Sequence, residues 1–165
     1  MRLEIELVPS SCWHSNMRKA MSRDKWDKLR RGVYLQYEHR CGICRVSPQQ
    51  IQCHELWKYD DENHIQTLEG FIALCPMCHH VKHIGMAGVL ANEGKLDYNA
   101  VVAHFCKINN CSEEDFEQAK KQAFDQWRER SKHPLITDLG KYAHLVEEKR
   151  TPTSESTHRR PIQAI

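Results

Sequence analysis

The sequence has no long apolar run. None of its 165 residues belongs to a stretch approaching the ~20 apolar residues that a membrane-spanning helix requires. The N-terminal residues also lack the unbroken apolar core of a signal peptide, because Leu3, Ile5 and Leu7 alternate with charged side chains. That alternation predicts a half-buried strand instead. We therefore expect a cytoplasmic protein with no membrane partner.

The chain also lacks an internal repeat and a large net charge, which is only +2. A chain of this length typically builds one domain, which we expect over residues 1–146. Residues 147–165 are polar and without periodicity, which predicts a disordered tail.

Positive charge is nevertheless concentrated between residues 18 and 46, where nine basic side chains stand against three acidic ones. A basic segment of this kind is typical of modest, salt-dependent binding to nucleic acid. It is equally typical of a solvated helix face. The nine basic residues are Arg18, Lys19, Arg23, Lys25, Lys28, Arg30, Arg31, Arg40 and Arg45.

The apolar pattern predicts an α+β fold. After the possible N-cap Ser22, apolar side chains recur at helical spacing from Trp26 to Tyr37, which predicts an amphipathic N-terminal helix that ends at the Cys41–Cys44 turn. Residues 51–59 and 71–75 are predicted as two short strands joined by an acidic loop over 60–70. Helical spacing resumes at His79. Two C-terminal helices are expected, capped by Asp97 and Ser112.

Cysteine, in contrast, is abundant, with eight residues. Four of them form two C-x-x-C pairs, Cys41 with Cys44 and Cys75 with Cys78. Each pair can direct two thiolates at one ion from a single turn, and two pairs complete a tetrahedral zinc site. In a reducing compartment this spacing predicts a structural Zn²⁺ site rather than disulfides. The alternative is four reduced thiols that pack separately.

Histidines follow the second cysteine pair. His79 and His83 are four residues apart, so on a helix both imidazoles lie on one face and within reach of one cation. His54 lies on the first predicted strand, opposite that helix. A strand histidine facing a helix-bound metal suits phosphodiester hydrolysis, in which the imidazole deprotonates water and the metal stabilises the phosphate. The sequence indicates no partner residue for His80 or His104, so no function is predicted for either.

The order of these motifs resembles the HNH endonuclease family. The resemblance covers residues 41–83 and is carried by the first C-x-x-C pair, "CHELW" and "LCPMCHHVKH". It implies a ββα-metal finger with its motif core at 41–84, framed by a Cys₄ zinc site. It also implies that His54 is the general base in DNA cleavage. His79 and His83 would contribute to binding the catalytic Mg²⁺ or another divalent metal.

Two positions depart from the family pattern. Cys53 stands where many members have a metal ligand, and Gly70 stands where the family's middle asparagine is usually found, while Asn63 lies earlier. The group that orients His54 is therefore open. An acid from Glu55 or the loop residues could help to bind the metal; the loop acids are Asp60, Asp61 and Glu62.

Three functions are compatible with this sequence. One is a metal-dependent DNA endonuclease. The second is a non-catalytic zinc-finger module that binds nucleic acid or protein. The third is a nuclease subunit that is active only with a protein partner that supplies targeting. The sequence leaves the target, the biological setting and the oligomeric state open.

Overall fold

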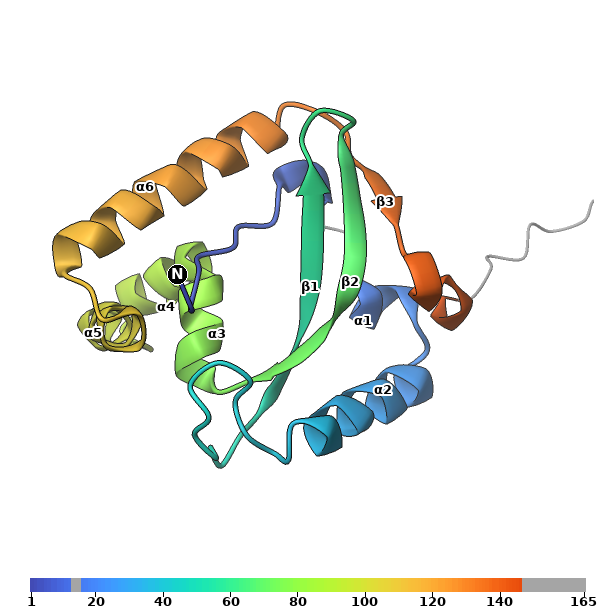
Figure 1. Cartoon of the computed structure of the whole chain (residues 1–165), viewed down its shortest axis with the longest axis horizontal. Coiled ribbons are helices and arrows are strands. Elements are labelled where there is room, and N and C mark those ends of the chain that lie inside the picture. Colours follow the sequence, from blue (N-terminus) through green and yellow to red (C-terminus); the bar gives the residue numbers. More distant parts are fainter. Residues whose placement is uncertain (13–15, 147–165) are drawn as a thin grey trace, which may run out of the picture.

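A β-hairpin forms the centre of the fold in the computed structural model, which describes residues 1–12 and 16–146 (Figure 1). Strand β1 (Gln52–Asp60) pairs antiparallel with β2 (Ile65–Leu74), and the short β3 (Ile136–Asp138) pairs parallel with the other edge of β2. The strand order β1-β2-β3 leaves β1 at an edge of the sheet. The predicted α+β class is confirmed. The predicted tail over 147–165 lies outside the described residues.

The connection between the two strands is shorter than the acidic sequence suggested. Strand β2 begins at Ile65, so the prediction of a loop over residues 60–70 is wrong. The Asp60 carboxylate accepts hydrogen bonds from the backbone N–H groups of Glu62 and Asn63, which closes a tight turn that ends with His64 at a φ of 53°. The acidic residues that follow β1 therefore form the hairpin turn, and the residues from Ile65 onward form β2.

The N-terminal helical region consists of α1 (Met17–Ala20) and α2 (Arg23–Gln36). The Ser22 cap is confirmed, because its hydroxyl accepts a hydrogen bond from the Lys25 N–H at 3.5 Å. The helix ends before the cysteine turn rather than at it. Glu38 and His39 adopt positive φ values of 54° and 55°, which an α-helix cannot continue through.

Two consecutive helices follow the hairpin. Helix α3 (Pro76–Lys82) begins three residues earlier than predicted, because Cys75 caps it and Pro76 occupies its first position, where a missing N–H costs nothing. Helix α4 (Ile84–Asn92) follows after His83, whose backbone leaves the helical conformation. Helix α3 packs against the hairpin, and α4 lies on the same side of it (Figure 1).

The two predicted C-terminal helices are confirmed as α5 (Tyr98–Asn109) and α6 (Glu113–Arg130). Asp97 caps the first, and Ser112 forms a reciprocal capping box with Asp115 at the start of the second. Two 3₁₀ helices, η1 (Ser10–Cys12) and η2 (Gly140–Leu145), complete the regular structure of the described residues.

The N-terminal segment is not the predicted strand. Residues 1–9 have no regular secondary structure, yet Leu3 is fully buried. The Asn109 side chain takes the place of a neighbouring strand, because it accepts from the Leu3 N–H at 2.9 Å and donates to the Leu3 carbonyl at 2.8 Å. The alternating pattern thus predicted the burial of Leu3 correctly. The hydrogen bonds to its backbone come from Asn109 of α5 and not from a neighbouring strand.

Two hydrophobic cores are built on the hairpin and the elements on either side of it. One joins the N-terminal segment to α3, α4, α5 and α6, and the other joins α1 and α2 to β2 and η2. The predicted apolar stripe of α2 lies in the second core, with Val33 buried and Trp26, Leu29, Tyr34 and Tyr37 partly buried. No helix among the described residues is long and apolar enough to cross a membrane.

Phe105→Ala should lower the free energy of unfolding by about 3–5 kcal/mol, because it leaves a cavity in the larger core. The Phe105 ring is fully buried and meets Phe116 edge to face, with centroids 5.2 Å apart. Urea unfolding monitored by circular dichroism measures the loss. Leu35→Ala, at an exposed position of α2, is the control and should change stability by less than about 0.5 kcal/mol. Equal effects of the two substitutions would contradict this placement of the core.

Candidate functional site

The four cysteines of the two C-x-x-C pairs lie together. Cys41 and Cys44 come from the loop after α2, and Cys75 and Cys78 come from the start of α3. Their four sulfur atoms lie within 4.8 Å of one another, and the Cys44 and Cys75 sulfurs are 3.6 Å apart. Four thiolates at zinc–sulfur bond lengths of ~2.3 Å are roughly 3.8 Å apart. The cluster could therefore hold a metal ion such as zinc.

Local backbone structure brings the first pair to the second. The Arg45 N–H donates to the Cys41 carbonyl, and Arg45 adopts a φ of 65°, which folds residues 41–45 into a tight turn. The Gly42 N–H donates to the Ala73 carbonyl at 2.8 Å and ties this turn to β2. A side chain at Gly42 would lie 2.7 Å from atoms of Ile72 and Tyr37, so the close approach requires glycine.

The cysteine cluster has a neighbour that the sequence did not indicate. The His104 Nε2 atom, on α5, lies 3.1 Å from the Cys78 sulfur. An imidazole N–H at this distance donates to a thiolate and offsets part of its negative charge, as outer partners of metal ligands do. Hydrogen bonds from the Cys75 and Cys78 thiols lower the pKa of Cys41, while the same contacts raise the pKa of Cys75 to about 11 and also raise that of Cys78. The thiolate form is therefore favoured at Cys41 and disfavoured at the two thiols that donate to it.

Freshly purified protein should contain one zinc ion per chain by elemental analysis, and Cys78→Ser should lose it. Because a structural zinc site contributes on the order of 10 kcal/mol of apparent folding free energy, the variant should also melt at a much lower temperature. Cys111→Ser is the control, since Cys111 lies outside the cluster. Zinc-free, fully folded wild-type protein would contradict the assignment.

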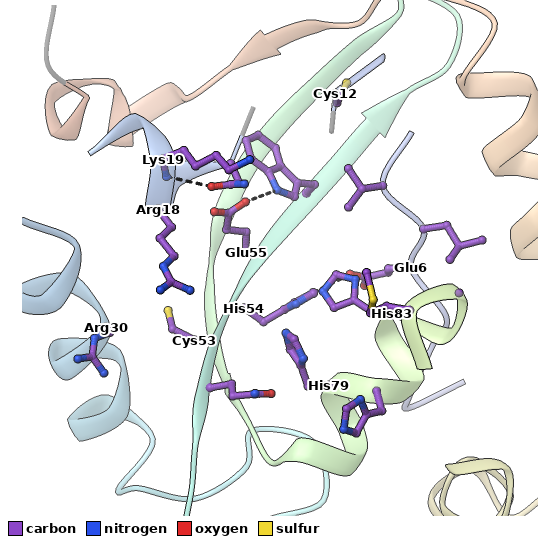
Figure 2. A pocket seen from close by; sticks show the side chains of 18 of the residues that line it. Glu6, Cys12, Arg18, Lys19, Arg30, Cys53, His54, Glu55, His79 and His83 are labelled. Carbon is purple, nitrogen blue, oxygen red and sulfur yellow. Dashed lines mark hydrogen bonds and ion pairs between the residues drawn. The ribbon is translucent and has the colours of Figure 1, made fainter. Parts of the chain in front are cut away.

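The structure also brings three predicted site histidines together. His79 lies within α3 and His83 follows its last residue, while His54 reaches them from β1 (Figure 2). One ring nitrogen from each lies within 4.8 Å of the others. The ring centroids are 5.5 Å apart for His54 and His79, 5.0 Å for His54 and His83, and 4.7 Å for His79 and His83. This trio could hold a metal ion, whereas His80 lies outside it, as predicted.

Burial keeps two of these imidazoles neutral. It is the main cause that lowers the pKa of His79 to about 3 and that of His83 to about 4, and the neighbouring histidines add to both shifts. Both rings are therefore unprotonated near neutral pH. The neutral imidazole is the form that binds a metal, so the pair needs no proton loss to accept one.

A carboxylate from the N-terminal segment holds the third ring. His54 is buried, with 7% of its side chain exposed, and its Nε2 atom lies 3.1 Å from the Glu6 carboxylate. The other carboxylate oxygen of Glu6 accepts a hydrogen bond from the buried Lys82 ammonium. Burial alone would raise the pKa of Glu6, but the His54 hydrogen bond and the Lys82 charge lower it. Glu6 is thus the group that orients His54.

Sequence reasoning missed Glu6 because 48 residues separate it from His54. Its place depends on a tertiary contact, since the Glu6 N–H donates to the Lys82 carbonyl at 2.9 Å and fixes the segment against the end of α3. The one local feature of the sequence around Glu6 is the alternation of apolar and charged residues. This pattern predicts a charged, exposed position on a strand and no contact with His54.

Cys53 and Gly70, which depart from the family pattern, and the acids of the hairpin turn do not belong to the histidine cluster. Cys53 packs against the α2 side of the hairpin, and burial raises its pKa to about 12, so it is a thiol and not a metal-binding thiolate at neutral pH. Asp60 bonds Asn63 in the hairpin turn, and Arg130 binds Asp61 with two hydrogen bonds of 2.6 and 2.9 Å. Gly70 pairs with Leu56 near the middle of the hairpin.

A groove of about 1420 Å³ runs along β1 and contains the three histidines (Figure 2). Cys53 points to the side where Arg18 and Arg30 lie, and His54 points to the side of His79 (Figure 2). Glu55 also lines the groove. Its carboxylate accepts hydrogen bonds from the Met17 N–H at 2.7 Å and the Trp57 indole at 2.9 Å, and burial raises its pKa.

No family model, curated protein or solved structure matches this chain. The likeness to HNH endonucleases therefore rests on the motif residues alone.

Glu6→Gln should lower stability by about 1–3 kcal/mol above pH 4.5, because it leaves the buried Lys82 charge without its partner. The folded-state pKa of Glu6 is lowered, so its contribution is complete above the ordinary glutamate pKa and is lost as the pH falls below it. Wild-type and variant stabilities should therefore converge in acid.

Urea unfolding at several pH values measures this difference. Glu4→Gln is the matched control, because Glu4 lies two residues away in the same segment and is exposed, and it should have little effect at any pH. A constant gap between Glu6→Gln and the wild type down to low pH would contradict the charge-based account.

Proposed function

We propose that this protein is a metal-dependent endonuclease that hydrolyses phosphodiester bonds in DNA, built on a ββα-metal finger like that of HNH enzymes. The observation that carries the proposal is the cluster of His54, His79 and His83 in a groove whose basic lining residues all come from α1 and α2. Basic side chains attract phosphates, and imidazoles bind divalent metals that promote phosphate hydrolysis.

The residues present fit a catalytic metal. His79 and His83 would hold it through neutral imidazoles that share one side of α3. A divalent metal bound there would stabilise the charge that develops on the phosphate and on the leaving oxygen. The four cysteines would hold a structural zinc that fixes the start of the same helix.

His54 is proposed as the general base. Its Nε2–H donates to Glu6, and this tautomer leaves Nδ1 unprotonated and able to take a proton from water. The imidazolium that results is stabilised by the Glu6 carboxylate, much as a buried carboxylate stabilises the histidine of a catalytic triad. Glu6 acts through His54 and is therefore a positioning residue.

His54→Ala should abolish nicking of supercoiled plasmid and cutting of single-stranded circular DNA by the zinc-loaded protein in Mg²⁺ or Mn²⁺. Loss of a general base typically lowers rates by about 10²–10⁴-fold. His144→Ala is the control, because His144 is exposed on η2 and does not line the groove. Cleavage by His54→Ala at the wild-type rate would contradict the assignment of the base.

Calorimetric titration with Mn²⁺ separates two roles for His54. Unchanged Mn²⁺ affinity in His54→Ala agrees with a base, while lost affinity would make His54 a third metal ligand. Binding of DNA without cleavage by folded wild-type protein would instead favour the non-catalytic module or a subunit that requires a partner.

A further inference from the structure

We infer that the groove takes one unpaired DNA strand rather than a duplex, an inference that rests on the proposed nuclease function and specifies its substrate. The two walls of the groove differ in chemistry along their whole length. One wall carries all the basic residues that line it, and the other is apolar.

The basic wall belongs to α1 and α2. Four cationic side chains line the groove from this side, and Asp27 is the one acidic residue among them, bound to Arg30 at 2.7 Å. The four are Arg18, Lys19, Arg23 and Arg30. Their spread along two consecutive helices suits successive phosphates of one backbone, which is how charged grooves follow a single strand.

The opposite wall comes from the N-terminal segment, α4 and the end of α6. On α4, Met86 and Val89 remain 47% and 49% exposed, although both are large apolar residues. Such exposure costs free energy in water unless a ligand covers it. The wall consists of Leu7, Val8, Gly85, Met86, Val89, Leu90, Phe124 and Trp127.

A duplex fits these walls poorly. Its two phosphate backbones lie on both sides of each groove, so one backbone would face the apolar wall without any cation to neutralise it. An unpaired strand has phosphates along one side and the apolar faces of its bases along the other. The bases can then cover the exposed surface of α4 while the phosphates contact α1 and α2.

The histidine cluster lies between these walls. His54 projects from β1, and His79 lies on α3, while His83 is the residue that joins α3 to α4, so the cluster and the apolar wall are continuous (Figure 2). A strand held by its bases on α4 and by its phosphates on α2 would pass its backbone across β1. The scissile phosphate then lies at the histidines, with flanking phosphates on the basic wall.

The test measures binding of the full chain to fluorescein-labelled oligonucleotides by anisotropy, without added Mg²⁺ or Mn²⁺ so that the DNA stays intact. The probes are a 12-nucleotide mixed-sequence single strand and its blunt duplex. The single strand should bind at least about tenfold more tightly than the duplex. Met86→Gln with Val89→Gln should remove most of that preference and leave duplex binding unchanged.

Leu35→Gln is the matched control, because Leu35 is an exposed apolar residue of α2 that does not line this groove, and it should retain the preference. Equal or tighter binding of the duplex would overturn the single-strand inference, while metal-dependent plasmid cutting would keep the nuclease proposal intact. An undiminished preference in the Met86/Val89 variant would overturn the role of the apolar wall. Absence of binding to both probes, together with absence of cleavage, would overturn the nuclease proposal as well.

Discussion

The position of helix α3 is the constraint on which both candidate metal sites depend. Within one short segment, Cys75 and Cys78 face the loop after α2, whereas His79 and His83 face β1. Any shift of the helix would therefore change both sets of ligand distances at once. A metal held by the four cysteines would fix the start of α3 far more firmly than packing of so short a helix can. We propose that the cysteine cluster serves mainly to hold the histidines in place.

The N-terminal segment fixes the other side of the histidine cluster. Glu6 joins His54 of β1 to Lys82 at the end of α3, so one carboxylate connects the two elements that supply the histidines. Two cores on opposite sides of the hairpin then determine which helices border the groove. Because α1 and α2 belong to one core and α4 and α6 adjoin the other, the groove has a basic wall and an apolar wall.

Much of this arrangement could be predicted from the sequence, because its signals are local. The two C-x-x-C pairs and the i, i+4 spacing of His79 and His83 specify which side chains gather, although His83 follows the last residue of α3. Ser22 and Ser112 mark helix starts through their own hydrogen bonds. Contacts between distant segments were not predictable in this way. Glu6 and His104 reach their partners only after α3 and α5 pack. The start of β2 was predicted too late, because the acidic residues of the hairpin turn indicated a long loop.

Anomalous X-ray diffraction from crystals soaked in Mn²⁺ is the most direct test of the claim that α3 carries ligands of two metals with different chemistry. We predict a zinc peak at bonding distance from the sulfurs of the four clustered cysteines, and a manganese peak at bonding distance from His79 and His83. A single zinc peak, with manganese absent from the histidines or bound elsewhere, would contradict it.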